Sequence, residues 1–273
     1  MLILEVYFLT LPKRVRVVEK KTTPPHRILN SKNPEVSVII PLMNERRTIA
    51  RVIANARKVH PKTEVIVVAN GSRDGSSQLA KQMGAKMITY KKALGHDVGR
   101  SIGAKAAKGN VLLFLDGDIV FSTNSLKRLV HAVKNGVDVA LNKYNGTLAR
   151  KNVHSVVLSK YALNNMLSLP HLKGASLTTI PHALSRKALE KIGAENLTVP
   201  PKAQTIAANK GLVIKGVHYF EVGKTNPRKR RGPNDPLKDL IIGDHLEAIQ
   251  HLLDKTDPRG GMTDLDRNRK MVK

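Results

Sequence analysis

Residues 111–118 read Val-Leu-Leu-Phe-Leu-Asp-Gly-Asp, in which five apolar residues run directly into two carboxylates separated by one glycine. Five apolar residues are too few for a helix, but they suit a strand covered on both faces, as in parallel sheets. Ligands of open parallel sheets bind beyond the carboxyl ends of the strands. Asp116 and Asp118 are therefore predicted where a cation or a phosphate can approach, and Gly117 permits that approach. An isolated Asp-Gly-Asp is more often a surface turn, so the choice between a turn and a binding site depends on the rest of the sequence.

The composition limits the class of protein and the kind of partner. The chain has 273 residues, 41% of them hydrophobic, which is enough for one large α/β domain with appendages. Its net charge of +26 attracts polyanions such as nucleotide phosphates and anionic lipid headgroups. Aromatic residues make up only 3%, so stacking platforms for nucleic acid are scarce and a nucleic-acid partner is not expected. The absence of cysteine excludes disulfides and thiolate sites and fits a reducing cytoplasm.

Apolar runs and helical patterns alternate along the first half of the chain. Strands are predicted at 36–41, 64–69, 86–90 and 111–115, and helices at 46–58, 76–83 and 97–107, the last capped by Asp97. This alternation predicts a doubly wound, mostly parallel α/β sheet with helices on both faces. Later elements are predicted at 124–134, 137–141, 186–192, 203–210, 212–222 and 236–253. The last of these is a helix with Leu237, Leu240, Ile241, Ile249, Leu252 and Leu253 inward.

Two basic segments flank the predicted domain. Residues 1–34 form a basic arm, and Arg228, Lys229, Arg230 and Arg231 lie in a proline-containing loop. We therefore divide the chain into the arm at 1–34, a catalytic domain at 35–222 and a C-terminal part at 223–273. The domain has a nucleotide half at about 36–120 and an acceptor half at about 121–222. The start lacks the leading charge of a signal peptide, and no apolar run reaches the ~18 residues of a membrane span. We expect a cytoplasmic protein, with peripheral contact to anionic membrane at its inner face.

Four sequence blocks, each at a predicted strand end or helix start, occur in the order typical of one family. They are Val-Ser-Val-Ile-Ile-Pro-Leu-Met-Asn-Glu at 36–45, Glu-Val-Ile-Val-Val-Ala-Asn-Gly-Ser-Arg-Asp-Gly at 64–75, Arg-Ser-Ile-Gly at 100–103 with Ala-Lys-Gly at 107–109, and Asp-Gly-Asp at 116–118. Together they resemble the family 2 nucleotide-sugar glycosyltransferases of the GT-A fold. A weaker match is the stretch 185–193.

The resemblance implies a metal-dependent glycosyltransferase with the GT-A fold. Such an enzyme moves a sugar from a nucleoside diphosphate donor, most commonly uridine-linked, to an acceptor hydroxyl. Cell-envelope polysaccharide or glycolipid synthesis is the kind of setting implied, with an anionic or lipid-linked acceptor. Mn²⁺ or Mg²⁺ would be held by Asp118 directly, with Asp116 holding the ribose or a metal-bound water, and His218 completing the metal shell. The resemblance places Pro41, Met43, Asn44, Glu45, Asn70 and Arg100 around the nucleotide, although Asn44 can simply satisfy its turn.

Two departures from the family pattern leave alternatives open. Ala69 stands where an acidic residue is usual, and the region 193–207 lacks the usual acidic pair that supplies a catalytic base. Glu195 and Asp244, the latter beside His245 on a helix that can fold back over the cleft, are the candidate bases. Without a clear base, a retaining transferase or a catalytically impaired polyanion-binding protein of the same fold stays open. A nucleotidyltransferase is disfavoured, because its glycine-rich loop after the first strand is absent.

Overall fold

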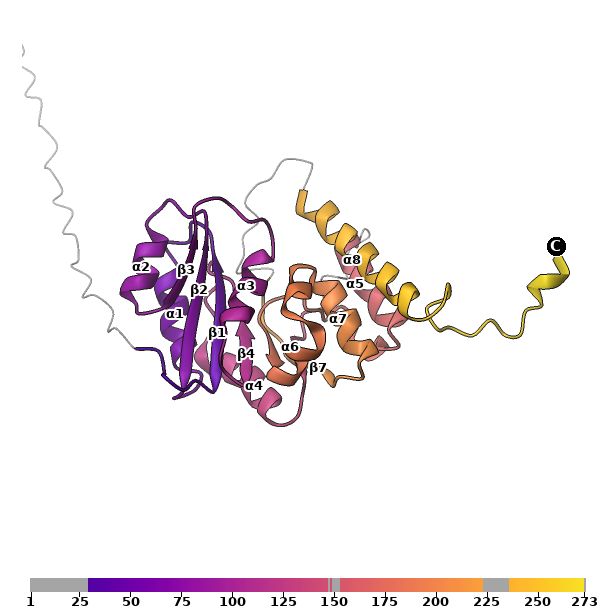
Figure 1. Cartoon of the computed structure of the whole chain (residues 1–273), viewed down its shortest axis with the longest axis horizontal. Helices are drawn as coiled ribbons and strands as arrows, with labels where there is room; N and C mark the ends of the chain where they lie inside the picture. Colours follow the sequence, from indigo (N-terminus) through magenta and orange to yellow (C-terminus); the bar gives the residue numbers. More distant parts are fainter. Residues whose placement is uncertain (1–28, 147, 149–152, 223–235, 273) are drawn as a thin grey trace, which may run out of the picture.

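The computed structural model describes residues 29–146, 148, 153–222 and 236–272 (Figure 1). These residues build one seven-stranded sheet in the order β3-β2-β1-β4-β6-β5-β7. The strands are β1 (Val36–Leu42), β2 (Thr63–Asn70), β3 (Lys86–Tyr90), β4 (Val111–Phe114), β5 (Val139–Asn142), β6 (His182–Ser185) and β7 (Ile214–His218). Only the two ladders of β6, with β4 and with β5, are antiparallel in this sheet. The predicted α/β class with a mostly parallel sheet is thus confirmed.

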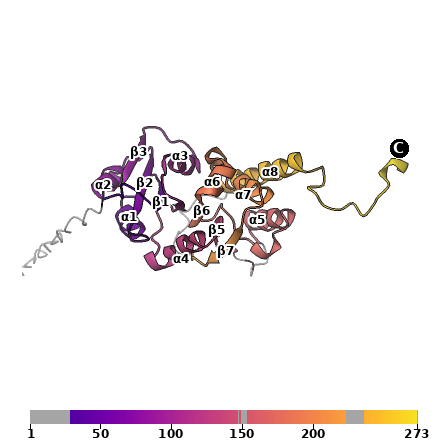
Figure 2. The same ribbon diagram turned by 60° about the horizontal axis from the view of Figure 1, so that its bottom comes forward.

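Helices cover both faces of the sheet, as Figure 2 shows for α1 and α4 on one side and α3 and α6 on the other. One face packs against α1 (Ile49–Arg57), α2 (Ser76–Gln82) and α4 (Thr123–Lys134). The other packs against α3 (Val98–Ala106), α6 (Arg186–Ile192), α7 (Pro200–Asn209) and the 3₁₀ segment Ala194–Thr198. A third, smaller apolar cluster joins α5 (Ser155–Met166) to α8 (Pro236–Lys255). Further 3₁₀ segments are Pro170–Leu172 and Arg269–Val272.

The period-2 geometry of the central strands explains why they are apolar throughout. In β1, Val36, Val38, Ile40 and Leu42 belong to the core on one face, while Ile39 belongs to the core on the other. A strand buried on both faces cannot alternate apolar with polar residues. Because β1, β2 and β4 are parallel, their carboxyl ends meet at one edge of the sheet, and the polar residues that end these strands lie together there.

Helix α3 lies unusually close to β1 because two of its residues are glycines. A Cβ atom added to Gly103 would lie 2.4 Å from Cγ2 of Ile39, and one added to Gly99 would lie 3.2 Å from Cβ of Pro41. The helix can approach the strand only because neither position carries a side chain. Arg100, between these glycines, is thereby brought to the carboxyl edge of the sheet.

Several elements differ from the sequence predictions. The sequence predicts no element between 142 and 185, yet this stretch contains α5 and the four-residue β6. Helix α7 begins at Pro200 rather than 203, because proline is tolerated in a first helical turn. The prediction of which α8 residues face inward is partly wrong, since Leu240 is 42% exposed while His245 is only 2% exposed.

The flanking segments are described only in part. Asn30 makes hydrogen bonds to the backbone of Val65 from both atoms of its amide, so this end of the predicted arm is anchored to β2. The rest of the arm, residues 1–28, and the basic cluster 228–231 lie outside the described residues. After α8, the chain to residue 272 extends away from the domain (Figure 1). Within the described ranges, none of the helices is both long enough and apolar enough to cross a bilayer.

Candidate active site

A cleft of about 440 Å³ opens at the carboxyl edge of β1, β2 and β4. It is lined by the predicted nucleotide and metal residues Pro41, Met43, Glu45, Asn70, Arg100, Asp116 and Asp118, together with Leu42, Ala93, Gly95, His96, Asp97 and Gly117. Two leucines of α8, Leu237 and Leu240, also line it. The cleft therefore joins the first half of the chain to a helix more than a hundred residues later.

The two aspartates after β4 lie at the bottom of a tight turn against β1. A Cβ atom on Gly117 would lie 3.2 Å from Cδ1 of Leu42 and 3.3 Å from the carbonyl oxygen of Pro41, so the turn has little room for a side chain there. Asp116 accepts a hydrogen bond of 3.0 Å from Nη2 of Arg100. Glycine at this position lets the backbone carry both carboxylates to the cleft.

The donor atoms fit a hard divalent cation that is shared with a ligand. Among the described residues there is no cluster of three or more His, Asp or Glu side chains that could hold a metal ion alone. Mg²⁺ is typically bound by one or two carboxylates together with substrate phosphates and water. Asp116 and Asp118 supply that minimum, and a diphosphate in the cleft would supply the remaining oxygens.

A buried ion-pair network holds the wall of the cleft beside Asp116. Arg100, which is 5% exposed, also pairs with Asp97, whose other carboxylate oxygen lies 2.6 Å from Nδ1 of His96. Burial disfavours the charged guanidinium, but the carboxylates of Asp116 and Asp97 outweigh it and raise the pKa of Arg100. Burial likewise opposes the Asp97 carboxylate, but Arg100 and His96 lower its pKa overall. The hydrogen bond to Asp97 raises the pKa of His96.

Asp97 does not act as the helix cap that the sequence predicts. It occupies the N-cap position of α3 with a left-handed φ of 61°, and its side chain makes no capping hydrogen bond. Its carboxylate is instead committed to Arg100 and His96. The spacing of three between Asp97 and Arg100 is the signal that could have revealed this pair from sequence.

A neutral histidine lies beneath the network. His182 of β6 is opposite Phe114 in the sheet and stacks on its ring at a centroid distance of 5.1 Å. Burial and then the nearby charge of Arg100 lower the pKa of His182 to about 3. The imidazole is therefore uncharged at physiological pH, and Arg100 keeps its two carboxylates as its counter-ions. No sequence pattern marked His182, because β6 itself was missed.

The two predicted asparagines have structural hydrogen bonds. Asn44 has a left-handed φ of 60°, and its Oδ1 accepts a hydrogen bond of 2.8 Å from the backbone of Arg73. Asn44 does not line the cleft, and its side chain satisfies a backbone group of the turn instead. Asn70 does line the cleft, and its Nδ2 donates to the carbonyl of Gly95 at 3.2 Å while its Oδ1 accepts from the backbone of Leu94. Asn70 thus shapes the loop that carries His96 and Asp97.

Helix α8 carries a carboxylate, Asp244, one turn beyond the leucines that line the cleft, although Asp244 is not itself a lining residue. Leu237, Leu240 and Asp244 recur at spacings of three and four, so they share the helix face that covers the site. Partial burial, and then the charge of Asp97, raise the pKa of Asp244 to about 6. The fold-back of the last helix that the sequence suggested is thus present.

Two further basic groups lie where α8 meets α5. His245 is buried, its Nδ1 lies 2.7 Å from the carbonyl oxygen of Ile241, and its Nε2 has no partner among the described residues. The ammonium group of Lys160 donates a 2.6 Å hydrogen bond to Oγ1 of Thr179, and burial lowers its pKa to about 8. Sequence reasoning missed Lys160 because α5 was not predicted.

Glu195 and His218 are not brought together with the aspartates. Glu195 is exposed in the 3₁₀ segment Ala194–Thr198 and does not line the cleft. His218 ends β7, three strand positions from β4, which at ~4.8 Å per position is roughly 14 Å. It contacts the ring of Phe220 edge-on, and burial followed by the charges of Arg128 and Lys143 lowers its pKa.

Comparison with known proteins places the fold. A solved structure of glucosyl-3-phosphoglycerate synthase from Mycobacterium tuberculosis, in complex with Mn²⁺, UDP and glucosyl-3-phosphoglycerate, superposes with a TM-score of 0.57 at 22% identity. The match covers 85% of this chain and 81% of that one. The likeness shows a shared fold.

Two curated glycosyltransferases are similar to this chain, and in each of them the match covers only part of the relative's length. Glycosyltransferase AglE of Haloferax volcanii is 34% identical over 120 residues, which cover 41% of this chain and 40% of the relative. The dolichol-phosphate mannosyltransferase of Pyrococcus furiosus is 30% identical over 234 residues, which cover 80% of this chain and 64% of the relative. The chain thus spans less than two thirds of either relative.

The family itself is shown by a match that spans more than half of the chain. Residues 37–192 fit the sequence profile described as glycosyl transferase family 2, and this stretch runs from β1 through the aspartate pair to the end of α6. Both aspartates of the cleft and most of the sheet lie within that stretch. The chain therefore belongs to glycosyl transferase family 2.

Proposed function

We propose that this protein is a metal-dependent glycosyltransferase that takes its sugar from a nucleoside diphosphate donor, with uridine as the nucleoside. The observation that carries the proposal is the pair Asp116 and Asp118 facing a cleft in a chain whose net charge is +26. A protein that bound polyanions through charge alone would gain nothing from two carboxylates there. The Mn²⁺ and UDP in the similarly folded mycobacterial structure support the same proposal.

The residues of the cleft divide the work of binding the donor. Asp118 would hold a Mn²⁺ or Mg²⁺ ion with Asp116, while Pro41 and Met43 offer an apolar wall for the base. When bound, the cation neutralises the charge that builds on the leaving diphosphate. Arg100 fixes the orientation of Asp116 through their 3.0 Å hydrogen bond, so it is a positioning residue in this proposal.

Asp244 is the proposed proton acceptor for a hydroxyl acceptor. Asp244 lies one turn beyond Leu240 on the helix face that meets the cleft, and a pKa near 6 leaves it ionised yet basic at neutral pH. In a direct displacement, the acceptor oxygen bonds to the sugar's C1 as its proton passes to Asp244. The bond from C1 to the diphosphate oxygen breaks, and the nucleoside diphosphate leaves with that electron pair. Glu195 is not proposed for this step, since its 3₁₀ segment contributes no lining residue to the cleft, whereas α8 contributes two.

A second candidate is transfer to a phosphate oxygen of a lipid-linked acceptor. The name of the Pyrococcus furiosus relative, dolichol-phosphate mannosyltransferase, favours it. A phosphate oxygen is already ionised at neutral pH and needs no base, so Asp244 would then be dispensable. The net charge of +26 supports peripheral contact with an anionic membrane, on its cytoplasmic face, where such a lipid would lie.

Calorimetric titration of UDP and GDP, with and without Mn²⁺, tests the donor site. We expect one nucleotide, UDP, to bind only with the metal, and the Asp118→Asn variant to lose that binding. Asp254→Asn serves as the matched control, because it removes an equal charge from an exposed position near the end of α8.

Binding that ignores both the metal and Asp118→Asn, and that fades as salt rises, would contradict the proposal and favour the polyanion-binding alternative. Once donor and acceptor are found, the configuration of the product separates the direct displacement from a retaining reaction. Loss of transfer in Asp244→Asn with donor binding intact would identify the hydroxyl route, and unchanged transfer would identify the phosphate route.

A further inference from the structure

His96 lines the cleft of the aspartates, yet the sugar transfer proposed above gives it no task. It lies directly before Asp97 on the loop between β3 and α3. Its side chain is 37% exposed, whereas that of Asp97 is 3% exposed. A ligand in the cleft can therefore reach the imidazole, while the carboxylate that contacts the ring is shielded from solvent.

Asp97 holds one of the two ring nitrogens of His96. Nδ1 lies 2.6 Å from one oxygen of the Asp97 carboxylate, whose other oxygen is paired with Arg100. Burial opposes ionisation of Asp97, but Arg100 lowers its pKa, so the carboxylate is ionised at neutral pH and accepts the proton of Nδ1. Nε2 lies on the other side of the ring and makes no hydrogen bond within the described part of the chain. The tether thus fixes the ring and leaves Nε2 for a ligand.

The groups around His96 favour its charged form, in which Nε2 also carries a proton. The hydrogen bond to Asp97 raises the pKa of His96 most, and the charges of Asp97 and Asp116 raise it further, against the opposing effects of burial and Arg100. Asp244 of α8 is close enough for the charge of His96 to act on it, although burial and then Asp97 raise the Asp244 pKa overall. Nε2 can therefore donate a hydrogen bond to an anion.

The same network leads from His96 to the proposed metal site. Arg100 bridges Asp97 and Asp116, and its hydrogen bond to Asp116 is 3.0 Å long. Among the described residues that line the cleft, His96 and Arg100 are the two that can carry a positive charge. Arg100 is 5% exposed and already has both carboxylates as partners. His96 is consequently the cationic side chain that a bound phosphate group can contact.

We propose that His96 binds the diphosphate of the sugar donor, donating a hydrogen bond from Nε2 to a phosphate oxygen while Asp97 holds Nδ1. This inference rests on the proposed function, because it adds a residue to that donor site. A charge-assisted hydrogen bond strengthens as negative charge gathers on the leaving diphosphate. His96 would thus stabilise the same charge as the cation.

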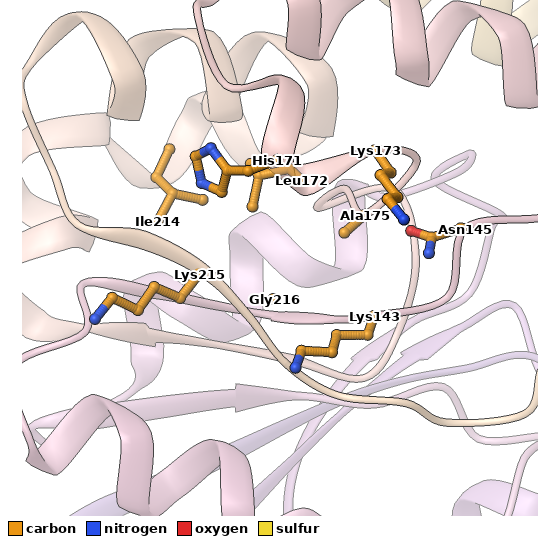
Figure 3. A pocket seen from close by; sticks show the side chains of 9 residues that line it. All are labelled: Lys143, Asn145, His171, Leu172, Lys173, Ala175, Ile214, Lys215 and Gly216. Carbon is orange, nitrogen blue, oxygen red and sulfur yellow. The ribbon is translucent and has the colours of Figure 1, made fainter.

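The test is a calorimetric titration of UDP and, separately, of inorganic pyrophosphate, each with Mg²⁺ at pH 6. The proteins are the wild type, His96→Ala, Asp118→Asn and the control His171→Ala. His171 is likewise exposed, and it lines a separate cavity of about 450 Å³ that shares no lining residue with the cleft (Figure 3). Thermal midpoints equal to that of the wild type would show that the histidine variants fold.

Both ligands should bind at least tenfold more weakly to His96→Ala, because a charged hydrogen-bond donor is lost, and within twofold of the wild type to His171→Ala. A second measurement uses the wild type labelled with ¹⁵N-histidine. The Nε2 resonance of His96 should shift when UDP and Mg²⁺ are added, while that of His171 should not. A histidine that merely held Asp97 in place would show no such shift.

Three results would overturn the inference, and they differ in what they leave standing. Wild-type affinity in His96→Ala, with binding lost in Asp118→Asn, overturns the role of His96 but keeps the donor site. Weaker binding of UDP with unchanged binding of pyrophosphate also overturns it, since His96 would then contact the nucleoside. A wild type that binds neither ligand with Mg²⁺ overturns both the donor site and the role of His96.

Discussion

Replacing Arg100 with methionine should strongly destabilise the protein, because it leaves a carboxylate buried without its main counter-ion. The side chain of Asp97 is 3% exposed, and after the replacement only His96 remains to pair with it. Breaking a buried pair from one side typically costs about 3–5 kcal/mol. At roughly 2–4 °C per kcal/mol for a domain of this size, a loss of ~3 kcal/mol lowers the thermal midpoint by ~6–12 °C.

The loss should depend on pH with a defined sign. In the wild type, the Asp97 pKa lies below its ordinary value, so the pair's contribution is complete above about pH 4 and is lost as pH falls through that lowered pKa. Without Arg100, burial raises the Asp97 pKa and favours the neutral acid. The stability deficit of Arg100→Met should therefore be largest near pH 8 and shrink toward pH 4.5.

Urea denaturation of the wild type, Arg100→Met, Asp97→Asn and the double variant measures these effects. The double variant should recover more than half of the loss, since it removes the stranded charge together with its partner. A deficit below ~1 kcal/mol, or one of equal size at pH 4.5 and pH 8, would refute the assignment of Arg100 and Asp97 as a buried pair.

Three further changes probe the site and its supports. Asp244→Asn should raise the free energy of unfolding at pH 8 by at most ~1 kcal/mol, since the carboxyl is partly solvated, and should leave it unchanged at pH 4. The raised pKa of Asp244 means that its ionisation opposes folding. Thermal midpoints of the variant and the wild type at both pH values test this prediction. Gly103→Ala should destabilise by ~1–3 kcal/mol in urea denaturation, because its Cβ would meet Ile39 at 2.4 Å, while Gly243→Ala, with open space around it, should not. Asn142→Leu should destabilise by ~3 kcal/mol or more, because this fully buried amide bonds to the backbone of Ile180, Tyr144 and Phe220; an unchanged urea midpoint would contradict that role.

Much of the site could be predicted from residues 36–120 because its parts lie at strand ends. Pro41, Asn70 and Asp116 each follow an apolar run, and parallel strands bring their carboxyl ends to one edge of the sheet whatever the details of packing. Glycines at 99, 103 and 117 are equally visible in sequence, although the close approaches that require them are not.

The sequence by itself thus determined the α/β class, the positions of the first four strands along the chain, the family resemblance and the edge at which the aspartates lie. Only the tertiary structure decided the order of the strands in the sheet, the pairing of Asp97 with Arg100, the neutral His182 that stacks on Phe114, and the contact of Leu237 and Leu240 with the cleft. Strand periodicity and turn residues are local properties that the sequence displays directly. Which distant side chains share a buried space depends instead on how α5, β6 and α8 pack, and α5 and β6 carry too weak an apolar pattern to be recognised before the chain is folded.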